Sequence, residues 1–215
     1  MITMSEFAKR RKTLMGAMDK DDILILSAAP EYYRNADTVF AYRQDSDFYY
    51  LTGFEEPEAV MVLAPKRKEG EFILFNRVRD KSREIWDGPR AGQAGAVKNF
   101  QADEAFPIEE LSERLPDLLV DRKAVHYPWG KNNGFDQVLS TALNKIRAKI
   151  RHGLPTPTAF YDSASLLHEM RLFKSRAEIA LMQEAVDITE KAHVVCFLRV
   201  LFYGLIWIIW FDLES

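Results

Sequence analysis

Four short apolar runs within the first eighty residues most constrain the fold of this chain. They are DILILSAAP (22–30), DFYYLTGF (47–54), AVMVLAP (59–65) and FILFNRV (72–78). Runs of this length, closed by proline, glycine or charged residues, are typical of buried strands. The last three are separated only by EEPE and KRKEGE, and connections this short favour antiparallel neighbours. We therefore expect these four segments to form strands of one sheet.

Helical patterns lie on either side of these runs. Ser5 is a predicted N-cap for an amphipathic helix over residues 5–18, and KAVHYP (123–128) is a further strand candidate. Later helical patterns cover residues 81–87, 107–119 and 135–151. A sheet with helices packed against it accounts for this order, so the sequence predicts an α/β domain over residues 1–153.

The character of the chain changes after residue 153. LPTPTAF (154–160) contains two prolines, which stop helices and restrict the residues before them, so we expect a linker and a short helix over residues 154–174. Ser175 and Glu178 form an S-x-x-E capping box. A long helix is therefore expected to open a second unit, residues 175–215.

The carboxyl-terminal tail is strongly apolar. Residues 194–211 contain one charge, Arg199, which divides them so that the uninterrupted apolar part runs only from Val200 to Phe211. A membrane-spanning helix needs about 20 apolar residues, and burying an arginine at its centre costs roughly 2.5 kcal/mol or more. This pattern favours an exposed, association-prone segment over a membrane span.

Charge and cysteine content exclude several classes of protein. The formal net charge is -3, and the short basic runs at residues 9–12 and 66–68 lack stacking aromatics, so no nucleic-acid partner is expected. The only cysteine, Cys196, cannot form an intrachain disulfide. The basic amino end has no apolar stretch of signal-peptide length. A cytoplasmic protein is the plain interpretation.

Acidic residues near YRQDSDFYYLTGF (42–54) raise the question of a metal site. Asp37, Asp45 and Asp47 could form a two-metal carboxylate cluster, since hard cations prefer several oxygen ligands. Arg43 shares a face with Asp45 and Asp47 if the segment is extended, which favours a structural ion-pair network. The aromatic rings, Phe48 and Tyr50 above all, then belong to the core.

The histidines give no metal or catalytic site. His168 stands in HEM, but position 172 is Leu, so the second imidazole of H-E-x-x-H is missing. His126, His152 and His193 have no ligand partners at metal-binding spacing. From these patterns alone we predict no catalytic residue and no metal ligand in this chain.

Three separated blocks resemble one family. RNADTVFAYRQDSDFYYLTGFEEPEAVMVL (34–63), FNRVRDKSREIWDGPRAGQ (75–93) and HEMRLFKSRAEIALMQEA (168–185) closely resemble bacterial Xaa-Pro aminopeptidases, the aminopeptidase P family. The resemblance covers residues 5–193. It implies a creatinase-like, ribonuclease-H-like amino-terminal domain with a mixed sheet flanked by helices, followed by a fragment of a "pita-bread" metallopeptidase domain.

The resemblance also implies an activity. The family removes the amino-terminal residue from peptides with proline second, using two manganese ions held by two Asp, one His and two Glu of the pita-bread domain. The present chain stops before those ligands, so we expect a truncated member that binds no manganese and is inactive alone. The alternative is a non-enzymatic self-association or interaction module, and a homo-oligomer is expected. Hydrolysis by the acids of the first domain themselves is a further, disfavoured alternative.

Three residues match positions that the family places at a substrate cleft between subunits. They are Asp37 in RNAD, Trp86 in EIWDG and Arg151 at the end of ALNKIRAKIR. In the family the tryptophan faces the proline-binding side of a neighbouring active site, and a flat indole suits a prolyl ring. The alternatives are a turn-forming aspartate, a half-buried tryptophan and an arginine at a helix carboxyl end.

Overall fold

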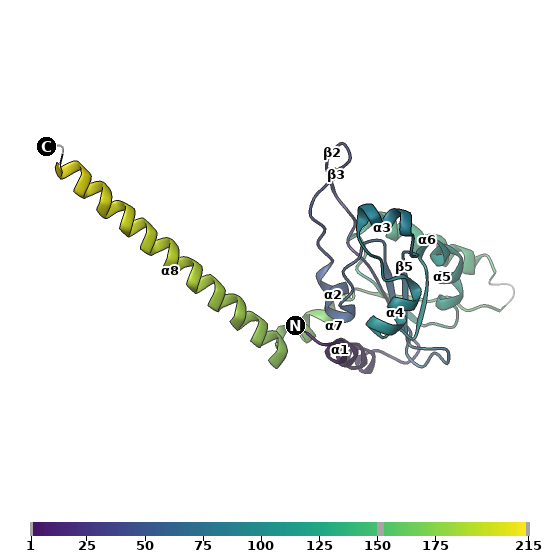
Figure 1. Cartoon of the computed structure of the whole chain (residues 1–215). Coiled ribbons are helices and arrows are strands. Elements are labelled where there is room, and N and C mark those ends of the chain that lie inside the picture. The colour runs from purple at the N-terminus through teal and green to yellow at the C-terminus, as the bar shows by residue number, and fades with distance from the viewer. Residues whose placement is uncertain (1, 150–152, 214–215) are drawn as a thin grey trace. The chain divides into compact units, whose positions relative to one another are not determined.

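The computed structural model describes residues 2–149 and 153–213. The chain divides into two compact units (Figure 1). Thr3–Leu172 forms one unit, and Phe173–Ser215 with the first two residues forms the other.

The larger unit is built on a six-stranded mixed sheet with the order β6-β5-β4-β1-β7-β8. The strands are β1 (Ile23–Ser27), β4 (Val60–Leu63), β5 (Phe72–Asn76), β6 (Glu104–Pro107), β7 (Ala124–His126) and β8 (Ala159–Tyr161). Because β4 is antiparallel to both β1 and β5, and the remaining pairs are parallel, all strands except β4 run in one direction. We call the edge at which these parallel strands end the carboxyl edge of the sheet.

Helices cover both faces of the sheet, as alternating side chains require. On one face, Ile23, Ile25 and Val62 pack in a core cluster with η1 (Ile108–Glu110), α5 (Leu111–Leu119) and α6 (Asn133–Arg147). On the other face, Leu24 and Met61 pack in a second cluster with α1 (Met4–Ala17), α2 (Ser46–Thr52), α4 (Gly92–Phe100) and α7 (Ala164–Leu172). This arrangement confirms the predicted α/β class and the flanked mixed sheet.

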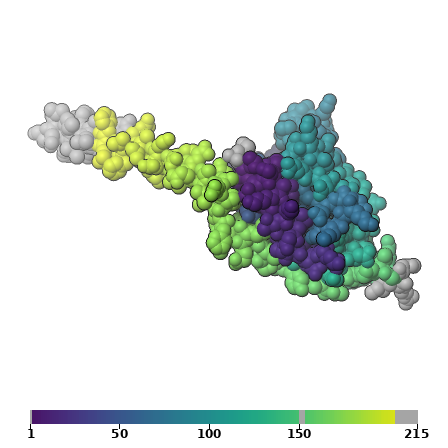
Figure 2. Space-filling model, turned by 90° about the horizontal axis from the view of Figure 1, so that it is seen from below, coloured from purple at the N-terminus to yellow at the C-terminus, as the bar shows by residue number. Residues whose placement is uncertain are grey.

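Two buried arginines attach α1, which lies across the surface in Figure 2, to the end of α2. Arg11 Nη1 donates to the carbonyl of Leu51 at 2.9 Å, and its guanidinium stacks 4.1 Å from the Phe72 ring centroid. Arg10 Nη1 donates to the carbonyl of Tyr50 at 3.1 Å. These donors satisfy carbonyls of the last turn of α2 that have no partner within the helix. Burial lowers the pKa of Arg11 to about 10.

The segment expected to be a strand over residues 47–54 is helix α2, so that prediction was wrong. Asp45 caps the helix, because its side chain accepts hydrogen bonds from the backbone N–H groups of Asp47 and Phe48, both at 3.0 Å. Gly53, with φ 65°, ends the helix in the left-handed conformation. The cap and the glycine override the strand propensity of FYYL. Phe48 is fully buried as expected, whereas Tyr50 is only half-buried.

The other predicted strands and helices are present, but two boundaries differ. The helix predicted over residues 135–151 is α6, which ends at Arg147, and residues 150 and 151 lie outside the described residues. Residues 22–30, 59–65, 72–78 and 123–128 contain β1, β4, β5 and β7, and the pairs β1–β4 and β4–β5 are antiparallel as expected. The segment expected as a linker contains β8, which pairs with β7, because an edge strand tolerates flanking prolines. The sheet therefore extends past residue 153, and the compact unit ends at Leu172.

The smaller unit contains a single long helix among its described residues, α8 (Arg176–Leu213). The predicted capping box is present: the Ser175 N–H donates to Glu178 Oε2 at 2.8 Å, and the Glu178 N–H donates to Ser175 Oγ at 3.3 Å. Phe197, Val200 and Phe202 are exposed on this helix. Within the described part of the chain, no helix combines the length and the apolar character needed to cross a bilayer.

Candidate functional site at the carboxyl edge of the sheet

A two-stranded hairpin follows the end of β1 and extends beyond the body of the larger unit (Figure 1). Its strands are β2 (Tyr33–Asn35) and β3 (Thr38–Val39), joined by a turn at residues 36 and 37. Asp37 is therefore an exposed turn residue, and Ala36 before it has a positive φ of 43°. Large apolar side chains are exposed along the hairpin and its base: Tyr32, Tyr33, Val39 and Phe40.

Helix α3 (Lys81–Asp87) follows the end of β5 and carries Trp86. The helix buries none of its residues, and Trp86 is 86% exposed, with Ile85 beside it at 78%. Because β1 and β5 are parallel, the hairpin and α3 both leave the sheet at its carboxyl edge. The structure thus brings Asp37 and Trp86 to the same edge, on different elements.

Polar side chains stabilise α3 in place of an apolar core. Asp80 caps the helix, accepting hydrogen bonds from the N–H and the hydroxyl of Ser82 at 2.9 and 2.6 Å. Arg79 pairs with Glu84 in a bidentate geometry, with both N···O distances 3.0 Å. Hydrogen bonds from Ser82 lower the pKa of Asp80, and the hydrogen bond from Arg79 lowers the pKa of Glu84. Both acids therefore remain ionised near neutral pH.

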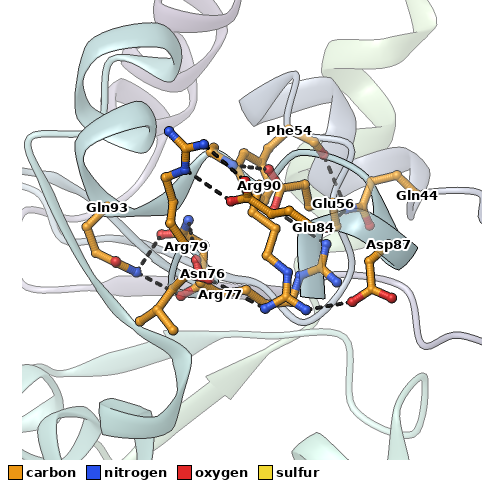
Figure 3. A network of polar contacts seen from close by, with 12 residues as sticks. Gln44, Phe54, Glu56, Asn76, Arg77, Arg79, Glu84, Asp87, Arg90 and Gln93 are labelled. Carbon is orange, nitrogen blue, oxygen red and sulfur yellow. Dashed lines mark hydrogen bonds and ion pairs between the residues drawn. The ribbon is translucent and has the colours of Figure 1, made fainter. Parts of the chain in front are cut away.

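A partly buried carboxylate, Glu56, connects the far end of α3 to the sheet (Figure 3). Its Oε1 accepts a hydrogen bond from the backbone N–H of Ala91 at 2.6 Å, and its Oε2 lies 3.5 Å from Arg77 Nη2. Arg77 follows directly on β5 and its side chain is 10% exposed. Arg90 binds Asp87 of α3 at 2.7 Å and the carbonyl of Val78 at 3.4 Å.

Glu56 is also joined to the base of the hairpin. Gln44 Nε2 donates to the carbonyl of Glu56 at 2.9 Å, while Gln44 Oε1 accepts from the N–H of Ala29 at 2.9 Å. The Tyr42 hydroxyl donates to the carbonyl of Ala29 at 3.1 Å, and burial raises the pKa of Tyr42, which keeps the hydroxyl protonated. A continuous path of polar contacts therefore runs from the hairpin base through Glu56 to α3.

The acidic residues near α2 form ion pairs rather than a metal site. Asp45 pairs with Lys131 at 2.6 Å, and Asp47 pairs with Lys131 at 3.3 Å and with Arg171. An ion-pair network was the favoured prediction, but its partners are Lys131 and Arg171 instead of Arg43. Among the described residues, no group of three or more His, Cys, Asp or Glu is arranged to hold a metal ion. The two-metal alternative for Asp37, Asp45 and Asp47 is therefore not supported by the geometry.

The sequence predicted three residues of a substrate cleft, and their role stays a prediction. Asp37 and Trp86 lie at one edge of the sheet, and Arg151 lies outside the described residues. Trp86 is exposed and not half-buried, and Asp37 does lie in a turn. Glu56, Gln44 and their partners were missed, because isolated polar residues in loops carry no periodic signal. Together the site offers an indole face and a carboxylate, groups suited to binding.

Comparisons with known proteins agree with this architecture. The profile of the family described as "Aminopeptidase P, N-terminal domain" matches residues 7–127. The chain is 41% identical over 193 residues to the Xaa-Pro aminopeptidase of Escherichia coli K12, covering 89% of this chain and 44% of that protein.

Solved structures give the same result. The Pseudomonas aeruginosa aminopeptidase PepP superposes with a TM-score of 0.88 at 50% identity, over 89% of this chain and 43% of that one. The Zn-substituted E. coli aminopeptidase P in complex with product has a TM-score of 0.85 at 41% identity, over 89% and 44% of the two chains. The chain thus spans less than half the length of the relatives that it matches.

Proposed function

Because the chain belongs to the aminopeptidase P family, we propose that its larger unit lines the substrate cleft of an Xaa-Pro aminopeptidase, presenting Trp86 to the proline side of a peptide. The observation that carries this proposal is the indole of Trp86, 86% exposed on a short helix that buries no residue. Ile85 beside it is also 78% exposed, and adjacent apolar side chains that remain in contact with water are typical of binding surfaces. Arg151 and Asp37 are proposed to contribute polar contacts at the same cleft.

The proposed reaction is removal of the amino-terminal residue from peptides with proline second. In the family this chemistry depends on a metal pair, proposed here to be manganese, which polarises the peptide carbonyl and activates water. The described residues provide no suitable donor set, so we assign them no hydrolytic step. We expect the 215-residue chain to contribute to the substrate cleft of a neighbouring subunit in the cytoplasm. We do not expect it to hydrolyse an Ala-Pro peptide alone.

Fluorine NMR can test the role of Trp86 directly. The chain has four tryptophans, so 5-fluorotryptophan labelling gives resonances that Trp→Phe substitutions assign. The unlabelled E. coli Xaa-Pro aminopeptidase, which is silent in this spectrum, is then added with an Ala-Pro-Ala peptide. We expect the Trp86 resonance to shift, and to shift less with Ala-Ala-Ala, because the prolyl ring offers the indole more apolar contact.

Trp129 provides the matched control. It is also exposed, at 42%, but lies in the loop after β7 and contacts Tyr127 and Phe160. Its resonance should stay unchanged under the same additions. The cleft-lining role is refuted if the Trp86 resonance does not change on addition of the enzyme and the peptide. It is also refuted if the Trp129 resonance shifts as much as the Trp86 resonance.

A second candidate function, a non-enzymatic interaction module, is favoured by the exposed apolar side chains of the hairpin: Tyr32, Tyr33, Val39 and Phe40. Solvent-exposed aromatics in such a group are typical of protein interfaces. Sedimentation of the chain alone distinguishes the two candidates. Self-association that Tyr33→Ser and Phe40→Ser abolish, with no response of Trp86 to Ala-Pro-Ala, would favour the interaction module.

A further inference from the structure

Helix α3 has no apolar attachment to the larger unit, so polar contacts must set the position of Trp86. The two large apolar side chains of the helix, Ile85 and Trp86, are 78% and 86% exposed, and none of its residues is buried. Its capping residue Asp80 and its Arg79–Glu84 pair stabilise the helix itself, and both lie on or directly before it. The segment that follows α3 contacts the rest of the unit through the Ala91 N–H, which is bound by Glu56, and through Arg90, which donates to the carbonyl of Val78.

We propose that Glu56 is a positioning residue that fixes α3, and through it Trp86, relative to the hairpin that carries Asp37. This inference rests on the proposed function of the site. Glu56 suits the role because it connects three elements: its carboxylate contacts Ala91 and Arg77, and its carbonyl is bound by Gln44. In Figure 3 these groups converge from the loop before β4, the end of β5 and the segment after α3.

The burial of Arg77, the cationic partner of Glu56, explains why this position requires a carboxylate, and Arg90 stands in the same relation to Asp87. The side chains of Arg77 and Arg90 are 10% and 12% exposed. The Nε atoms of both are buried and have no hydrogen-bond partner among the described residues. Buried charges are costly unless compensated, so these guanidinium groups depend on the nearby carboxylates of Glu56 and Asp87.

The geometry distinguishes two contributions of Glu56. The hydrogen bond to Ala91, at 2.6 Å, is short and fixes the backbone directly. The contact with Arg77, at 3.5 Å, is longer and supplies mainly charge. Glu56→Gln keeps an acceptor for Ala91 and removes the charge, while Glu56→Ala removes both. The two variants should therefore differ in a graded way.

Amide exchange and fluorine NMR on the chain alone test this proposal. In Glu56→Ala we expect the Ala91 amide to exchange about tenfold faster or more, because a hydrogen bond to a charged group is lost. We also expect the Trp86 fluorine resonance to shift, because release of α3 changes what lies next to the indole. Glu56→Gln should give a smaller increase in exchange and an intermediate shift.

Glu104→Gln is the matched control. Glu104 is also a partly buried carboxylate, 28% exposed, and it pairs with Arg67 at 2.5 Å. It lies at the start of β6, opposite Ile73 of β5 and away from the carboxyl edge of the sheet. It should leave the Trp86 resonance unchanged even where it lowers stability. If Glu104→Gln moves Trp86 as much as Glu56→Ala does, or if Glu56→Ala leaves both Trp86 and Ala91 unchanged, the positioning role is wrong.

These readouts use no peptide and no second protein, so they can be separated from the test of the proposed function. If Glu56→Ala releases Trp86, but Trp86 in the unmodified chain does not respond to Ala-Pro-Ala, the positioning role is retained and the cleft-lining role is rejected. If Trp86 responds equally to the peptide in the unmodified chain and in Glu56→Ala, the cleft-lining role is retained and the positioning role is rejected.

Discussion

Replacement of Asp45 by alanine should destabilise the larger unit, because Asp45 has two separate roles. Its carboxylate accepts two N–H groups at the start of α2, at 3.0 Å each, and pairs with Lys131 at 2.6 Å. Loss of an N-cap costs about 0.5–2 kcal/mol. The ion pair contributes less, about 0.2–1 kcal/mol, because Lys131 is 46% exposed and screened by solvent. We expect Asp45→Ala to cost about 1–3 kcal/mol in all.

Asparagine separates the two roles, since it caps helices as well as aspartate does. Asp45→Asn should therefore lose only the ion pair and cost about 0.2–1 kcal/mol. Urea unfolding followed by the emission of Trp129, with the other tryptophans replaced by phenylalanine, measures both changes. The dependence on urea should stay the same, because neither variant alters the surface exposed on unfolding.

Asp80 provides a contrasting cap. It caps α3 with similar geometry, but α3 buries no residue, so its loss should fray the helix locally and change global stability by under about 0.5 kcal/mol. If Asp45→Ala costs no more than Asp80→Ala, or if Asp45→Asn costs as much as Asp45→Ala, the assignment of separate cap and charge contributions is wrong.

Three further predictions concern pH and the two ends of the fold. The pKa values of Asp80 and Glu84 are lowered, so their stabilisation of α3 is present above about pH 4.5 and is lost as pH falls through the lowered values; the Trp86 fluorine resonance should move only in that acid range. A chain ending at residue 153 should be less stable than one ending at residue 172 by at least about 2 kcal/mol, because it lacks β8 and the buried Leu167; equal urea midpoints would contradict this. Deletion of residues 194–215 should raise soluble yield without changing the fold of the larger unit, since Phe197 and Phe202 are exposed. An unchanged yield would argue against the tail as the source of association.

The strands of the sheet could be predicted where apolar runs had clear ends. β1, β4 and β5 lie in short, mainly apolar segments bounded by charged residues or proline, and every residue of β4 and β5 is buried. The α2 segment was predicted as a strand because FYYL has strand propensity, whereas its cap and its terminal glycine make it a helix. β8 was missed because it is a three-residue edge strand beside prolines, whose pairing depends on β7.

The site could be predicted only as single residues. The resemblance proposed Trp86 and Asp37 as cleft residues, which stays a prediction, and it gave no indication of how either side chain is positioned. The contact of Glu56 with Ala91 joins residues 35 apart in the sequence, and such a contact depends on the pairing of β4 with β5. Local patterns contain no information about pairs of this kind, since each residue taken alone is an ordinary loop side chain.

The strand order has a consequence for how the chain folds. β1, β4 and β5 are joined by antiparallel pairings of shorter range that can form early, whereas the other side of β1 must wait for β7, since Ile23 pairs with Val125. During synthesis, the side of β1 that faces away from β4 therefore remains an edge open to association until β7 leaves the ribosome. Ile73→Val should then slow refolding, and Val125→Ala should mainly speed unfolding. Equal effects of the two substitutions on the refolding rate would show instead that β7 joins the sheet in the transition state.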